Sequence, residues 1–181
     1  SSDVCSSDLE HWALDPKVFA NYAKHYKTGE AMPQELVDKI LKARSFNQGY
    51  ATTEYLSAAL LDLAWHTQKA DAPLQDVGAF EASALKKFKV DLPQVPPRYR
   101  TTYFDHIWGG GYSAGYYAYF WAEVLDHDAY QWFTEHGGLT AANGQEFRDK
   151  ILSRGNSVEL STLYRDFRGK DPSVEPLLKF R

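Results

Sequence analysis

Residues 106–123 read His-Ile-Trp-Gly-Gly-Gly-Tyr-Ser-Ala-Gly-Tyr-Tyr-Ala-Tyr-Phe-Trp-Ala-Glu and indicate a helical fold. The part after the glycines predicts a helix from about Ser113 to His136, which Gly137 and Gly138 would end. With about 3.6 residues per turn, one stripe of this helix gathers three phenols and a carboxylate, Tyr112, Tyr116, Tyr119 and Glu123. Buried phenols need hydrogen-bond partners, so this stripe indicates the wall of a site rather than a plain core. The opposite side is also largely apolar, and we expect it to be buried as well, at Tyr117, Trp121, Val124 and Asp128.

The glycine run Gly109-Gly110-Gly111, with His106 at its edge, is a candidate for contact with a ligand. Three glycines let the backbone approach closely and offer N–H and C=O groups to an extended peptide. An isolated run of this kind is more often a flexible turn before a core helix. A phosphate loop is disfavoured, because no strand precedes the run and no Gly-Lys-Ser/Thr follows it.

The rest of the chain also predicts helices, and therefore an all-α fold without strand pairs or hairpins. Pro16 would open the first helix and Gly29 would end it, while Pro33 would open a second that runs through Leu41. Further helices are expected over residues 48–66, from an Asp76 cap to Phe88, and over residues 145–153 and 158–167. The buried stripe of the longest is expected at Leu56, Ala59, Leu60 and Leu63. The prolines of residues 92–97 force an extended connector.

The charge, the cysteine count and the apolar runs of the chain limit its possible partners and its location. The net charge of -4, with 20 basic residues spread along the chain, argues against nucleic acid or an anionic membrane surface. Cys5 is the single cysteine, so we expect no internal disulfide and no cysteine-based zinc site. With no secretory signal or apolar run of about 20 residues, the chain is expected to be cytoplasmic.

The chain carries an ordered set of motifs along its length. Besides residues 106–123 these are Glu10-His11-Trp12, Phe46-Asn47-x-Gly49-Tyr50, Leu56-Ser57-Ala58-Ala59-Leu60-Leu61-Asp62, Val95-Pro96-Pro97-Arg98-Tyr99-Arg100, Ile151-Leu152-Ser153-Arg154-Gly155-Asn156-Ser157 and Phe167-Arg168-Gly169-Lys170. Together they resemble the thimet oligopeptidase-type zinc metallopeptidase family, nearest to its bacterial peptidyl-dipeptidase branch. Such an ordered set is far more specific than any single motif.

The resemblance implies the C-terminal helical part of a neurolysin-like gluzincin catalytic domain over residues 10–181, in an incomplete form. Family members hold Zn²⁺ with His-Glu-x-x-His on one helix and a later glutamate. None of the six histidines here has the i, i+4 spacing of that motif, so no metal ligand is expected in this chain. We also expect Ser1–Leu9, which repeats Ser-Ser-Asp, to be a non-native tail.

The resemblance also implies roles for the tyrosines. The residue matching Tyr119 donates a hydrogen bond to the oxyanion that forms when zinc-bound water attacks the scissile carbonyl. Those matching Tyr112 and Tyr116 assist it or bind substrate backbone, and His106 contributes a further donor. Alone, Tyr119 would be interpreted as a core residue, but the flanking motif reverses that preference. Arg98, Arg100 and Arg154 are open candidates for binding a substrate carboxylate.

The expected function is therefore hydrolysis of short unstructured peptides, with release of C-terminal dipeptides, by a complete enzyme. This chain would need the N-terminal half of that enzyme as its partner and would be inactive alone. A non-catalytic helical peptide-binding module that uses the same tyrosines is the main alternative. An unrelated hydrolase is disfavoured, because no serine, cysteine or paired-carboxylate arrangement has a recognisable spacing.

Overall fold

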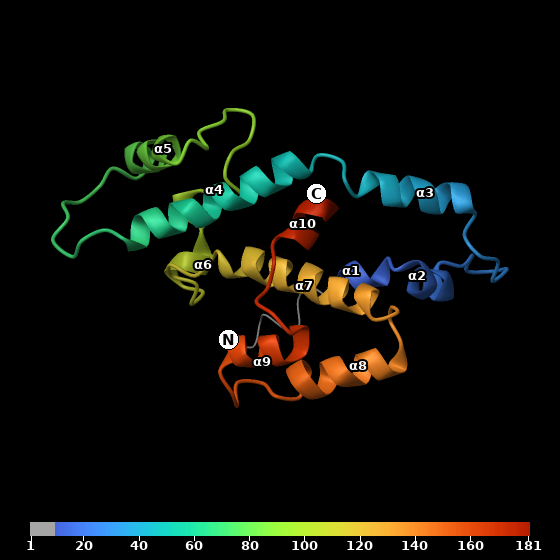
Figure 1. Ribbon diagram of the computed structural model, residues 1–181. Helices are drawn as coiled ribbons and strands as arrows, with labels where there is room; N and C mark the ends of the chain where they lie inside the picture. Colours follow the sequence, from blue (N-terminus) through green and yellow to red (C-terminus); the bar gives the residue numbers. More distant parts are fainter. Residues whose placement is uncertain (1–9) are drawn as a thin grey trace. The chain divides into compact units, whose positions relative to one another are not determined.

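The computed structural model describes residues 10–181, and its regular structure is helical apart from one isolated antiparallel bridge between Lys24 and Ala31 (Figure 1). The all-α prediction is confirmed. The elements in chain order are α1 (Glu10–Ala13), α2 (Pro16–Tyr22), α3 (Gln34–Ala43), α4 (Gln48–His66), α5 (Val77–Lys87), η2 (Thr101–Tyr103), α6 (Asp105–Trp108), α7 (Ala118–Glu135), α8 (Ala141–Phe147), η3 (Arg148–Leu152), α9 (Leu160–Arg168) and α10 (Glu175–Phe180).

The chain forms two compact units. The central unit spans Asn47–Tyr119 and holds α4, α5, η2, α6 and the first residues of α7. The terminal unit combines the chain up to Phe46 with Phe120–Arg181. The tail proposed for Ser1–Leu9 lies outside the described residues, and its origin stays a prediction.

In the central unit α4 supplies the main packing surface. Its buried residues are Ser57, Ala58, Ala59, Leu61 and Asp62, whereas Leu56, Leu60 and Leu63 are only half-buried. The expected stripe is therefore confirmed at Ala59 and wrong at the three leucines, which lie beside the fully buried face rather than on it. Small alanines allow close approach of neighbouring segments, and Phe104, Ile107 and Tyr116 pack against them. As expected, Asp76 caps α5, where its carboxylate accepts the Ala79 N–H at 2.8 Å.

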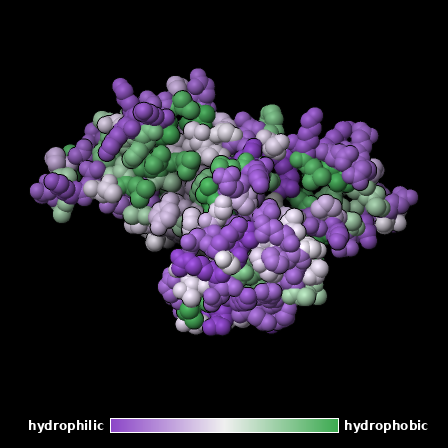
Figure 2. All heavy atoms as spheres, in the orientation of Figure 1, coloured by the Kyte–Doolittle hydropathy of each residue, from purple (hydrophilic) through white to green (hydrophobic). Residues whose placement is uncertain are grey.

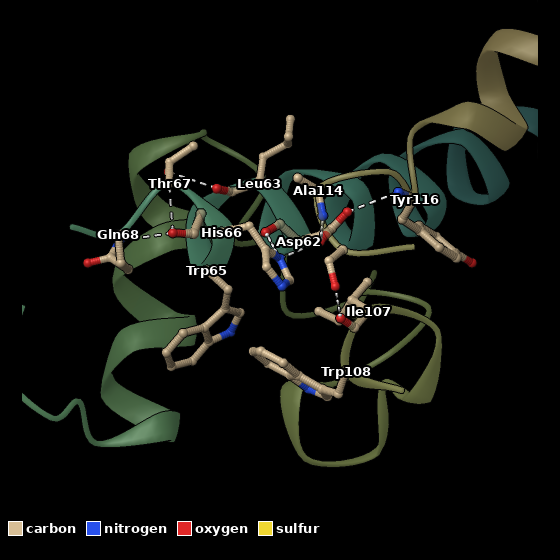
Figure 3. Close-up of polar contacts among 12 residues, drawn as sticks. Asp62, Leu63, Trp65, His66, Thr67, Gln68, Ile107, Trp108, Ala114 and Tyr116 are labelled. Atoms are coloured by element: carbon tan, nitrogen blue, oxygen red, sulfur yellow. Dashed lines mark hydrogen bonds and ion pairs between the residues drawn. The ribbon is translucent and has the colours of Figure 1, made fainter. Parts of the chain in front are cut away.

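The helix expected from Ser113 begins at Ala118 instead. The preceding residues form a tight turn in which Ala114 has a φ of 55°. The Asp62 carboxylate accepts the N–H groups of Ala114 and Tyr116, both at 2.9 Å (Figure 3). These hydrogen bonds stabilise the turn, so its residues do not join α7. Helical periodicity could not reveal this, because Asp62 is 52 residues away from Ala114 along the chain.

The other end of α7 follows its prediction. The helix ends at Glu135, and Gly137 and Gly138 have φ values of 89° and 92°. The Gly138 N–H bonds the Phe133 carbonyl at 2.7 Å, which completes a glycine-dependent helix stop. The first predicted helix is too long, since α2 ends at Tyr22 and the chain turns back through the Lys24–Ala31 bridge.

The terminal unit has an aromatic core. Trp132 and Phe133 of α7 pack with Phe147 and Phe167, and Trp12 and Ile151 lie against them. The segment predicted as a helix over residues 145–153 is α8 followed by a π-helical turn, η3. The helix predicted over residues 158–167 is α9, which Glu159 caps.

Several large apolar side chains stay exposed. Leu36, Ile40 and Leu41 of α3 are exposed, and Figure 2 shows hydrophobic atoms over this helix. Tyr117 and Trp121 are exposed by 53% and 44%, so the expectation of burial all round α7 was wrong at these two residues. Within residues 10–181, no helix has both the length and the apolar character needed to cross a bilayer.

Candidate substrate-binding and catalytic site

The sequence-predicted site residues His106, Tyr112, Tyr116 and Tyr119 lie together in the central unit, and we call them the His106 cluster. The His106 ring centroid is 6.0 Å from Tyr112, 5.4 Å from Tyr116 and 6.4 Å from Tyr119. Tyr112 and Tyr119 stack at 5.3 Å, and Tyr116 meets Tyr119 edge-on at 5.4 Å. Three separate segments bring these rings together, namely α6, the turn before α7, and the first turn of α7.

The His106 cluster is graded in exposure. Tyr116 is buried and sits on the fully buried Phe104, with ring centroids 4.8 Å apart. His106, Tyr112 and Tyr119 are half-buried. One side of the cluster is therefore fixed by packing, while polar ring atoms remain on a side that solvent can reach.

Burial raises the pKa of the Tyr116 phenol to about 12. The neighbouring Tyr99 acts in the same direction, and the positive charge of Arg98 opposes it. Tyr116 is therefore neutral over the physiological range and can donate a hydrogen bond.

The glycine run directly follows α6 and is exposed. The N–H groups of Gly109 and Gly110 both bond the Asp105 carbonyl, at 2.8 and 2.9 Å, so these two donors already close the helix. A Cβ on Gly110 would lie 2.9 Å from the His106 Cα, and Gly111 has a φ of 82°. Glycine is therefore required here by local geometry, and the pairing of this run with a peptide stays a proposal.

The structure adds residues that the sequence did not single out. Tyr99 lies 5.0 Å from His106, and Tyr55 stacks on Tyr116 at 5.1 Å. The Tyr55 hydroxyl donates to the Tyr116 carbonyl. The available signal was spacing, because Tyr55 and Asp62 are two helical turns apart and therefore share one face of α4.

The three candidate arginines differ in position. Arg98 lies in the central unit, where its charge acts on Tyr116 and its side chain is 3.6 Å from Glu54. Arg100 pairs with the buried Glu81 instead. Arg154 is exposed in the terminal unit.

The described residues do not fit a zinc site. Across residues 10–181, no three histidine, cysteine or acidic side chains lie close enough together to hold a metal ion. His66 instead pairs with Asp62, with 2.7 Å between His66 Nδ1 and Asp62 Oδ1. His136 Nδ1 contacts the Trp132 carbonyl at 2.7 Å.

The helical fold agrees with a match to a known family. Residues 1–181 match the family described as Peptidase family M3, and the chain belongs to this metallopeptidase family. The resemblance inferred from the motifs is confirmed.

Three relatives illustrate the match. The chain is 56% identical over 172 residues to dipeptidyl carboxypeptidase of Escherichia coli (strain K12), covering 95% of this chain and 25% of that protein. It is 38% identical over 178 residues to oligopeptidase A of the same strain, covering 98% and 26%. It is 32% identical over 176 residues to saccharolysin of Saccharomyces cerevisiae (strain ATCC 204508 / S288c), covering 96% and 24%. The chain thus spans about a quarter of the length of these relatives.

Proposed function

We propose that this chain forms the oxyanion- and substrate-binding part of a cytoplasmic zinc peptidase that releases dipeptides from the C-termini of short unstructured peptides. The observation that carries this proposal is the convergence of His106 with Tyr112 and Tyr119 from separate segments. Membership of Peptidase family M3 and the 56% identity to a dipeptidyl carboxypeptidase support it.

In this proposal Tyr119 supplies the main hydrogen bond to the developing oxyanion. A phenol is a neutral donor at pH 7 and can be aimed at a charge that grows only in the transition state. The ring centroids of Tyr112 and His106 lie 5.3 and 6.4 Å from that of Tyr119, and these two residues provide further donors. Tyr116 and residues 109–111 would contact the substrate backbone.

Zn²⁺ and the remaining wall of the substrate channel would come from the rest of the complete enzyme. The described residues offer no metal site, so we expect the 181-residue chain by itself to bind no stoichiometric zinc and to release no dipeptide. Metal analysis by mass spectrometry, with a dipeptide-release assay on the purified chain, tests this. Tight zinc binding together with hydrolysis by the chain alone would contradict the proposal that Zn²⁺ comes from the rest of the complete enzyme.

The decisive variant is Tyr119→Phe in the complete polypeptide that carries this chain. Loss of one oxyanion donor should lower kcat by roughly 10²-fold or more and leave KM little changed. Tyr117→Phe is a matched control, because Tyr117 is two positions away and 53% exposed. Steady-state kinetics on a short peptide give both constants.

Two outcomes would contradict this assignment. An unchanged kcat in Tyr119→Phe would make Tyr119 a packing residue. Peptide binding without cleavage by the complete polypeptide would instead favour the non-catalytic peptide-binding module.

A further inference from the structure

The Asp62 carboxylate is fully buried yet is not part of the His106 cluster. Its Oδ1 accepts the Ala114 N–H and its Oδ2 accepts the Tyr116 N–H, each at 2.9 Å (Figure 3). His66 Nδ1 lies 2.7 Å from Oδ1. A buried carboxylate is costly unless it is paired and hydrogen-bonded, and here two of its partners are backbone groups of the turn that leads to Tyr119.

This turn needs an external anchor. Ala114 has a φ of 55°, a left-handed conformation that residues other than glycine rarely adopt. Such strained backbone persists only where the surroundings over-determine it. The two N–H groups on either side of Gly115 point at one carboxylate, and the Gly115 carbonyl then accepts the Ala118 N–H at 3.0 Å to start α7. The geometry of the turn therefore sets where Tyr119 begins its helix.

A second residue of α4 fixes the other polar group of the Tyr116 backbone. The Tyr55 hydroxyl donates to the Tyr116 carbonyl, and the two rings stack at 5.1 Å. Asp62 and Tyr55 lie seven residues apart on one face of α4. One rigid helix thus binds both the N–H and the C=O of Tyr116.

The partner of Asp62 is itself held in place. The His66 ring packs against Trp108 with 5.4 Å between centroids, and Trp108 Nε1 donates to the Thr101 carbonyl at 2.8 Å. These contacts tie the last turn of α4 to α6, the helix that carries His106. Figure 3 shows His66 between Asp62 and the Trp108 side chain.

We infer that Asp62, together with Tyr55, is a positioning residue that locks the turn of residues 113–116 and so aims Tyr116 and Tyr119 in the site. The inference deepens the proposed function and rests on it for its catalytic consequence. Its structural part, the fixed conformation of residues 113–116, can be tested without an activity assay.

The first test is amide hydrogen exchange in the 181-residue chain with Asp62→Asn. Asparagine offers one acceptor in place of two, so exchange at the Ala114 and Tyr116 amides should become at least about tenfold faster. Glu81→Gln is the matched control, because Glu81 is also buried and accepts a backbone N–H from another element, that of Thr101 at the start of η2, at 3.0 Å. Unchanged exchange at both amides in Asp62→Asn would overturn the inference, whatever the activity.

A rescue variant separates positioning from a general loss of stability. Ala114→Gly relieves the left-handed strain, so in the Asp62→Asn background it should restore at least part of the lost protection and activity. In the complete polypeptide, Asp62→Asn should lower kcat about tenfold or more with KM little changed, while Glu81→Gln should not. Equal losses in the two single variants, without rescue, would mean that Asp62 is only a structural carboxylate.

If Asp62→Asn does not fold, the same measurements can be made on Tyr55→Phe. It removes only the hydroxyl bond to the Tyr116 carbonyl and retains the stacked ring. We expect faster exchange at the Tyr116 amide and a lower kcat, and an unchanged result for both would overturn the inference. If the complete polypeptide cleaves no peptide but the turn amides respond as expected, the proposed function fails while the locked turn stands.

Discussion

Each unit of the chain contains a cluster of aromatic rings, but the two clusters are built from different chemistry. The terminal unit packs Trp132, Phe133, Phe147 and Phe167, rings without hydroxyl groups, and all four are buried. In the central unit the His106 cluster consists of three phenols and an imidazole, and all of these except Tyr116 are half-buried. The first arrangement stabilises a core, whereas the second holds polar rings close together and leaves three of them partly exposed to solvent.

The terminal unit separates its polar groups from its rings. Asp128 is fully buried on α7 and lies 3.2 Å from Arg168 Nε, which belongs to α9. Arg168 also bonds Glu135 at 2.7 Å, and Tyr164 donates to Asp128 at 2.8 Å. These groups pair with one another, although Asp128 Oδ1 and Arg168 Nε make no hydrogen bond, so this phenol has a structural role. The hydrogen-bond partners of a phenol therefore distinguish a site from a core better than the presence of the phenol alone.

The largest expected effect is on the terminal core. Phe133 is 1% exposed and contacts Trp12 at 4.6 Å and Trp132 at 5.2 Å. Phe133→Ala should lower the free energy of unfolding by about 3–5 kcal/mol through lost burial and a cavity. Tyr112→Phe, which keeps its ring, should cost about 0.5–1.5 kcal/mol. Urea unfolding of the chain measures both, and equal costs would erase the distinction between the clusters.

A smaller effect is expected from the structural phenol of the terminal unit. Burial, and then the hydrogen bond to Asp128, raise the pKa of Tyr164 far above its ordinary value. Tyr164→Phe removes a donor from a buried carboxylate and should destabilise the fold by about 1–3 kcal/mol. Tyr117→Phe, at an exposed phenol, should change stability by less than about 0.5 kcal/mol. A similar small change for both in thermal unfolding would show that Asp128 does not need Tyr164.

The smallest expected effect is a fall in the free energy of unfolding at alkaline pH, caused by one phenol in each unit. Burial raises the pKa of Tyr116 in the central unit and of Tyr130 in the terminal unit to about 12 each, and for Tyr130 a hydrogen bond to Asp15 adds to it. Between about pH 10 and pH 12 the unfolded chain loses these protons while the folded chain keeps them, so stability falls as pH rises.

Each phenol should contribute about 1 kcal/mol to the loss of stability between about pH 9 and pH 11. Tyr116→Phe and Tyr130→Phe should each remove their own part of this dependence in urea unfolding at the two pH values. A pH dependence that neither variant alters would show that these two phenols ionise alike in the folded and unfolded chain.

Part of the fold could be predicted because its signals are local. Asp76, Pro16 and the pair Gly137-Gly138 act within a few residues of the helix ends that they define, and the structure agrees at each. The start of α7 could not be predicted in this way. Its first turn is displaced by the Asp62 carboxylate, which acts on the backbone of Ala114 and Tyr116 from a distant part of the sequence.

The candidate site likewise has a part that the sequence predicted and a part that it did not. Spacing along a supposed helix grouped Tyr112, Tyr116 and Tyr119, and these rings do lie together, but a turn and a helix start bring them there. Glu123, expected in the same stripe, instead pairs with Arg181 at 2.7 Å within the terminal unit. Tyr99 was missed, since a ring contact across segments leaves no periodic signal in either segment. For Tyr55 the one available signal, its spacing from Asp62 on α4, does not reveal the contact with Tyr116.

The sequence by itself determined the helical class, several helix boundaries such as those of α3, α4 and α5 and, through an ordered set of motifs, membership of a metallopeptidase family. These depend on caps, breakers and residue order, which are local or can be read along the chain. Only the tertiary structure decided which face of α4 is buried, where α7 begins and how His106 meets the three tyrosines. The first two depend on contacts between segments far apart in sequence, such as the bonds from Asp62 and Tyr55 to the turn before α7, and the third depends on the shape that this turn takes, so none can be read along the chain.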